Sequence, residues 1–156
     1  MFKKTTLAAI GLAVAASAVF AGSHAGPFDA AVTARQSHMK LYGHNLGILG
    51  AMAQGKADYD AEAASAAAKN LVALASMGQS SYWPQGSDSE ANEGTRALPA
   101  IWSDFPGVMK TIGELQAAAA GMDAAAGTGL DALKTAMGPL GGACGACHKA
   151  YRKPNS

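Results

Sequence analysis

The segment CGACHKAYRK, residues 144–153, lies close to the end of the 156-residue chain. It holds both cysteines of the protein, Cys144 and Cys147, and His148 follows them directly. On a helix, residues at i, i+3 and i+4 share one face, so the two thiols and the imidazole would project from the same side. A disulfide between cysteines this close would constrain the unfolded chain very little. The pattern therefore indicates a chemical site on a helix rather than a structural crosslink.

The spacing C-x-x-C-H is the attachment signature of c-type haem. Each thiol adds across one vinyl group of the macrocycle to form a thioether, and the imidazole becomes the proximal iron ligand. Two alternatives are weaker. A thioredoxin-like redox pair needs a βαβ context, and a structural zinc site needs four ligands where three cluster here. The motif predicts one haem c per chain, attached at Cys144 and Cys147, with its iron bound by His148.

The N-terminal residues 1–25 have the pattern of a secretory signal peptide. The positive start MFKK precedes the apolar run TTLAAIGLAVAASAVFA, and small residues allow cleavage after Ala21 or Ala25. A retained membrane anchor is disfavoured because the run is short for a span and no stop-transfer charge follows it. The sequence thus predicts an exported, periplasmic protein with no membrane span in its mature part. That part is a single domain, residues 26–156.

The composition favours a packed helical protein. Hydrophobic residues make up 49% of the chain and charged residues 15%, alanine is abundant, and β-branched residues are sparse. The net charge of +1 gives no sign of a nucleic-acid-binding surface. Apolar periodicity and breakers predict helices near 28–54, 60–77, 99–122 and 130–152, with a polar loop at 78–98. We expect Pro139 to kink or interrupt the last helix. Four helices with mostly short connections predict an all-α, antiparallel four-helix bundle.

A C-x-x-C-H motif at the C-terminal end of a four-helix chain resembles the class II cytochromes c, the group that contains cytochrome c′. Further matching segments are ARQSHMK at 34–40, GKADYDA at 55–61 and TRALPAIW at 95–102, so the resemblance covers nearly all of the mature chain. It implies a haem protein that carries electrons or binds gases rather than an enzyme. It also implies periplasmic redox proteins as partners, and a homodimer formed through the first two helices.

The resemblance gives several other residues an expected role. Met39 stands four residues after the arginine of the RQ pair, a position that lies over the open haem face in this family. Arg35 and Gln36 are implied to contact the haem edge or its propionates, and Arg152 to face the proximal imidazole. His38 is only one residue from Met39, off that helical face, and we expect it to be exposed.

Two kinds of class II protein remain open at this point. Low-spin members use a methionine of the first helix as sixth ligand and carry electrons, whereas cytochromes c′ keep five-coordinate iron and bind nitric oxide or carbon monoxide. A methionine at the position of Met39 occurs in both kinds. The segment 44–60 and Pro139 look more like the low-spin members, and a thioether is a competent haem ligand. We therefore expect a one-electron carrier ligated by His148 and Met39, with the gas-binding protein as the alternative.

Overall fold

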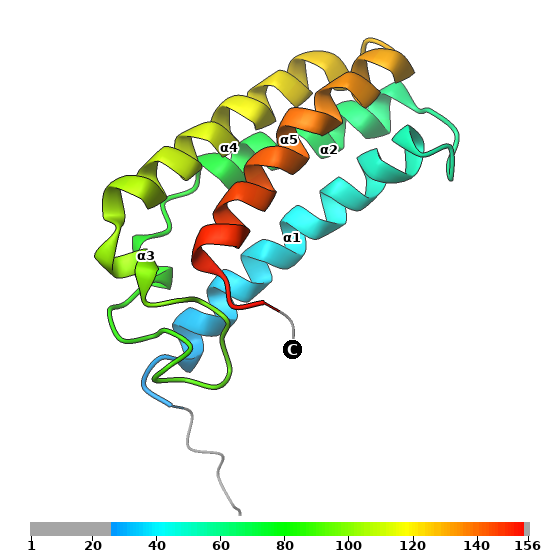
Figure 1. The fold of residues 1–156 in the computed structure, drawn as a ribbon. Coiled ribbons are helices and arrows are strands. Elements are labelled where there is room, and N and C mark those ends of the chain that lie inside the picture. The colour runs from blue at the N-terminus through cyan, green and yellow to red at the C-terminus, as the bar shows by residue number, and fades with distance from the viewer. Residues whose placement is uncertain (1–25, 155–156) are drawn as a thin grey trace, which may run out of the picture.

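The structure is a computed structural model that describes residues 26–154, so the expected signal peptide at 1–25 lies outside the described residues. Four long helices run alternately up and down and pack as a bundle (Figure 1). Their bounds are α1 Asp29–Ala53, α2 Ala61–Ser76, α4 Phe105–Ala126 and α5 Leu130–Tyr151. A 3₁₀ turn, η1 (Ser80–Tyr82), and the short helix α3 (Ala100–Ser103) lie in the long connection between α2 and α4. The predicted all-α, antiparallel four-helix bundle is confirmed.

Side-chain caps set the start of two helices. Asp60 Oδ1 accepts hydrogen bonds from the backbone N–H groups of Glu62 and Ala63 at 2.9 and 3.0 Å, and α2 begins there. Asp104 Oδ1 accepts from the N–H of Gly107 at 3.1 Å and starts α4. The predicted helix at 99–122 is therefore divided at Asp104. The reason is Pro106, which lacks the N–H needed to continue α3 but suits the first turn of a new helix.

Of the two expectations for Pro139, the interruption of the last helix is wrong, since α5 continues through it, whereas the kink stays a prediction. The proline is exposed, whereas Leu133 and Leu140 on either side are 0% and 1% exposed in the bundle core. Tertiary packing of such an apolar face supplies most of a helix's stability in a protein. Here that packing outweighs the loss of one backbone hydrogen bond at the proline.

The core combines small and large side chains. α2 and α4 contribute alanines that let the helix backbones approach, and leucine and methionine fill the space that remains. Its completely or almost completely buried members are Leu49, Ala64, Ala68, Leu71, Ala119, Met122, Ala126, Leu133 and Leu140. α1 and α5 are neighbours but pack less closely than the other adjacent pairs. The region between them is where the C-x-x-C-H motif lies.

Candidate functional site

The motif occupies the last two turns of α5. Cys144, Cys147 and His148 are all partly buried, while the neighbouring Gly145, Ala146, Lys149 and Ala150 are exposed. Both cysteines are free thiols, and the three functional side chains share one face of the helix, as their spacing predicts. A single helical face therefore presents two thiols and an imidazole toward the bundle.

Burial governs the protonation of these groups. It raises the pKa of the Cys144 thiol, and the nearby Cys147 adds to the effect. Burial also lowers the pKa of His148, with smaller contributions in the same direction from Arg152 and Arg96. The imidazole is thus held in its neutral form, which is the form that binds a metal.

Met39 and His148 lie at the same height on facing antiparallel helices. Gly50 of α1 lies beside the Met137 side chain of α5, where a methyl group at position 50 would come within 3.9 Å of Met137 Cε. Met39 precedes Gly50 by eleven residues, and His148 follows Met137 by eleven. Because every helical residue rises 1.5 Å, equal steps in opposite chain directions bring both residues to one level. Eleven residues are also about three turns, so Met39 shares the side of α1 on which Gly50 meets α5.

The most buried face of α1 contains His38 rather than Met39. His38 is 4% exposed, so its expected exposure is wrong, whereas Met39 is 41% exposed. The inward stripe runs through His38, Tyr42, Asn45 and Leu49. Its spacing of three and four residues is regular, but the polar side chains concealed it from a search for apolar periodicity. Met39 lies beside this stripe, on the side that faces α5.

Arg35 ties α1 to the loop at 78–98. One guanidinium nitrogen donates to Tyr82 O at 3.3 Å and Ser87 Oγ at 2.7 Å, and the other donates to Ser87 O and to Thr95 Oγ1 at 2.8 Å. The group also lies 4.8 Å from the centre of the Trp83 ring. Four of the five N–H donors of this side chain are therefore committed to the loop. The Nε–H is left for the predicted propionate contact, which stays a prediction.

Two other predicted residues lie at the margin of the site. Gln36 is exposed and donates to Gly94 O at 2.8 Å. Arg152 is exposed directly after α5, where it forms an antiparallel bridge with Ala97. Lys153 N also donates to Arg96 O at 2.8 Å, so the loop and the chain end support each other just beyond His148. The haem contacts expected of Gln36 and Arg152 stay predictions.

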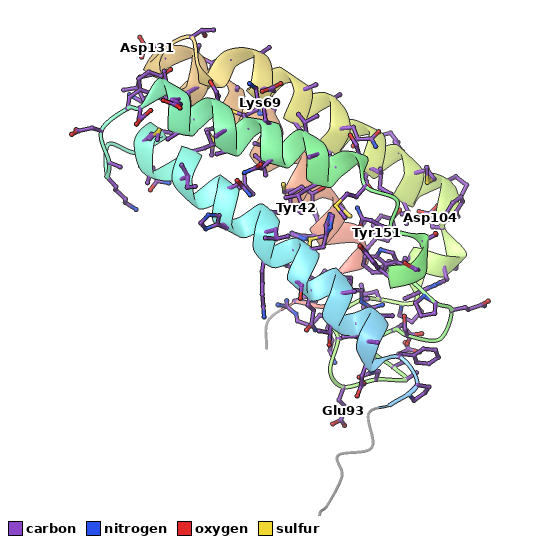
Figure 2. The ribbon with its side chains drawn as sticks, turned by 180° about the vertical axis from the view of Figure 1, so that it is seen from behind. Tyr42, Lys69, Glu93, Asp104, Asp131 and Tyr151 are labelled. Atoms are coloured by element: carbon purple, nitrogen blue, oxygen red, sulfur yellow. The ribbon has the colours of Figure 1, made fainter. Side chains whose placement is uncertain are left out.

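Tyr151 and Asp104 form a contact whose role the sequence analysis missed. Tyr151 is 6% exposed, and its hydroxyl donates to Asp104 Oδ2 at 2.7 Å. The hydrogen bond to Asp104, with burial second, raises the pKa of Tyr151 to about 12. Figure 2 shows Tyr151 and Tyr42 directed into the bundle from α5 and α1. Nothing local in the sequence pairs Asp104 with a residue 47 positions away.

The residues present suit a macrocycle bound between α5 and α1. Two thiols and a neutral imidazole stand on the inner side of α5. On α1, His38 Nε2 and Tyr42 Oη are buried and have no hydrogen-bond partner within residues 26–154. Because buried polar atoms normally find partners, this pair indicates that a further group belongs beside it.

A four-helix bundle with a C-x-x-C-H motif on its last helix is the architecture of a c-type cytochrome of the bundle class. The family model described as Cytochrome C' matches residues 30–152, and the chain belongs to this family. The resemblance to class II cytochromes c is thereby confirmed. Haem c, with its iron, is the cofactor.

Relatives with known names agree with this assignment. Cytochrome c-554 of Cereibacter sphaeroides is 46% identical over 122 residues, which cover 78% of this chain and 80% of that protein. Cytochrome c′ of the same organism is 36% identical over 141 residues, which cover 90% and 95%. The solved cytochrome c′ from Rhodobacter sphaeroides superposes with a TM-score of 0.80 at 35% identity, covering 81% of this chain and 98% of that one. Within residues 26–154, no helix is long and apolar enough to cross a membrane.

Proposed function

We propose that the protein is a periplasmic one-electron carrier whose haem iron is ligated by His148 and Met39. Cys144 and Cys147 hold the haem through thioether bonds. The observation that supports this most is the close approach of Met137 to Gly50, because counting eleven residues from each along the antiparallel helices brings Met39 and His148 to a similar height. Met39 is 41% exposed, and a macrocycle anchored on α5 would cover its thioether.

The chain's own contribution would be to keep the two donors that hold the iron, His148 and Met39, fixed and uncharged. When bound, haem c supplies an iron that alternates between the ferric and ferrous states. The imidazole of His148 is neutral because burial lowers its pKa, and the thioether of Met39 carries no charge at any pH. Arg35 holds the loop 78–98 against α1, and that loop in turn binds the chain end that follows His148. Neither ligand needs to move or change protonation when an electron arrives.

The alternative is a five-coordinate, gas-binding protein, in which Met39 packs over the iron without ligating it. Its support comes from relatives. A variant of the cytochrome c′ from Alcaligenes xylosoxidans has been solved with carbon monoxide bound, and another ferrous variant with bound NO. Both readings give the chain a role in electron transfer or gas binding, not in the turnover of a substrate.

The proposed partners are redox proteins of the periplasm and a second copy of this chain. One solved cytochrome c′, with a TM-score of 0.72 and 29% identity, is described as showing ligand-controlled dimer dissociation.

Carbon monoxide binding to the ferrous protein tests the proposal. If Met39 ligates, the gas must first displace it, so binding should be slow and should accelerate strongly in the Met39→Ala variant. Met109→Ala is the matched control, because this methionine is also exposed, at 49%, but lies on α4. Equal binding rates for the wild type and Met39→Ala would contradict the proposed ligation and favour the gas-binding alternative.

A further inference from the structure

Positive charge gathers at the end of the chain that carries the attachment motif. The sequence has no acidic residue after Asp131, and its cations in that part are Lys134, Lys149, Arg152 and Lys153. The last three follow His148 within five residues, and all three are exposed. The final turn of α5 and the residues after it therefore form a basic surface beside the site.

A fourth cation reaches this surface from the loop at 78–98. Arg96 Nε donates to Lys153 O at 2.9 Å, and Lys153 N donates to Arg96 O at 2.8 Å. Ala97 also pairs with Arg152 in an antiparallel bridge. The loop and the chain end thus hold each other, and Figure 1 shows them side by side. These cations form the basic end of the molecule: Arg96, Lys149, Arg152 and Lys153.

The charges of the basic end act on the predicted haem ligand. Burial lowers the pKa of His148, and Arg152 and Arg96 lower it further, so both guanidinium charges lie close to the imidazole. Lys149 is the residue directly after His148 and is exposed. A molecule that binds to this surface from outside is therefore brought next to the attachment motif.

The acidic groups near the basic end do not form ion pairs with it. Asp104 contacts the last turn of α5, but it accepts a hydrogen bond from the hydroxyl of Tyr151. Figure 2 shows Glu93 of the loop pointing outward, away from the bundle. Within residues 26–154, the ion pair between side chains is that of Lys110 with Glu114, on α4. The charges of the basic end thus remain available to a partner.

We propose that the basic end is the docking surface through which the protein exchanges electrons with a partner protein whose own contact surface is acidic. The inference deepens the proposed function and rests on it, because such a surface serves a carrier that passes electrons to and from other proteins. Complementary charge steers two proteins together and raises the rate of encounter more than the final affinity. A carrier that must bind and leave its partner quickly benefits from this kind of contact.

Two small redox reagents of opposite charge test where electrons cross the surface. The ferrous, haem-loaded protein is oxidised by ferricyanide, an anion, and separately by tris(phenanthroline)cobalt(III), a cation, in about 0.1 M salt. Lys149→Glu should slow the oxidation by ferricyanide about twofold or more and should speed the oxidation by the cobalt complex. In about 1 M salt the Debye length is only about 3 Å, so both differences should disappear.

Lys134→Glu is the matched control, because it makes the same change of charge on the same helix. Lys134 is exposed and precedes His148 by fourteen residues, which is about 21 Å along α5. That distance is about two Debye lengths in 0.1 M salt, so both rates should be almost unchanged. Equal effects of Lys134→Glu and Lys149→Glu would overturn the proposal, since net charge would then govern the rate. Wild-type rates in Lys149→Glu would overturn it as well.

Poly-L-glutamate is a probe of the surface that does not depend on electron transfer. In the ferrous protein it should shift the amide NMR signals of residues 96–98 and 149–153, and Lys153→Glu should weaken these shifts. Shifts centred on another part of the chain would contradict the docking surface. Sedimentation of the protein with phosphatidylglycerol vesicles, without any response to poly-L-glutamate, would overturn the proposal in favour of a lipid surface.

The ferric spectrum separates this test from the proposed ligation. A high-spin wild type would refute ligation by Met39, but both reagents would still oxidise the iron and the comparison of variants would keep its meaning. A low-spin wild type whose oxidation rates do not respond to Lys149→Glu would refute the docking surface alone.

Discussion

Tyr151 donates a hydrogen bond to Asp104 across 2.7 Å, and this contact joins the last turn of α5 to the first turn of α4. Asp104 uses its other carboxylate oxygen to cap α4 through the N–H of Gly107. Because Tyr151 follows His148 by three residues, the contact fixes the end of the helix that carries the attachment motif.

Replacing Tyr151 by phenylalanine should make the stability of the fold less dependent on pH in the alkaline range. The pKa of Tyr151 is raised to about 12, so its hydrogen bond contributes stability at every pH below about 10, the ordinary tyrosine value. This contribution is lost as the pH rises from about 10 to 12. The Tyr151→Phe variant should therefore have a lower melting temperature than the wild type at pH 7. The difference in melting temperature between the two proteins should become smaller toward pH 12. Tyr59→Phe, which removes a hydroxyl bound to the Ala126 carbonyl, is the control. If the difference in melting temperature is the same at pH 7 and pH 12, the Tyr151 hydroxyl does not stabilise the fold in the way described.

Covalent attachment predicts that haem stays with the denatured protein during acid–acetone extraction. Replacing Cys144 or Cys147 singly by alanine should leave one thioether and weaken retention, and replacing both should abolish it. The measurement is the haem absorbance left in the protein pellet. Free extraction of haem from the wild type would show that the motif does not attach it.

Arg35→Lys should destabilise the protein by about 2 kcal/mol or more, because an ammonium cannot reproduce a buried guanidinium that meets several acceptors. The loop at 78–98 should also become more sensitive to proteases. Denaturant unfolding and limited proteolysis measure the two effects. Gln36→Ala is the neighbouring control, since that side chain is exposed and makes one hydrogen bond to the loop. Wild-type stability in Arg35→Lys would mean that the loop is held by other contacts.

The signal-peptide prediction concerns residues outside the described part of the chain. The mature protein from its native host should begin at Gly22 or Gly26 and should be recovered in the periplasmic fraction. N-terminal sequencing gives the answer directly. A mature chain that starts at Met1 would refute export by cleavage.

The sequence predicted the features that depend on local pattern. The approximate bounds of α1, α2 and α5, and the common face of Cys144, Cys147 and His148, follow from periodicity and spacing within a few turns. The four-helix architecture followed from the same patterns, together with the position of the motif at the chain end.

The features that the sequence did not predict depend on contacts between distant segments. Arg35 meets Ser87 and Thr95, which lie 52 and 60 residues away in a loop without regular structure. The burial of His38 depends on how α1 is rotated about its axis, and a polar residue gives little information about that rotation. The continuity of α5 through Pro139 is likewise decided by packing rather than by local preference.

Ligation of the iron by both Met39 and His148 can be read in the ferric near-infrared spectrum. The wild type should be low-spin and should show a sulfur-to-iron charge-transfer band. The band should vanish in Met39→Ala, with conversion to a high-spin spectrum, and persist in the Met109→Ala control. A wild-type protein that is already high-spin and lacks the band would contradict the claim and leave a five-coordinate cytochrome c′.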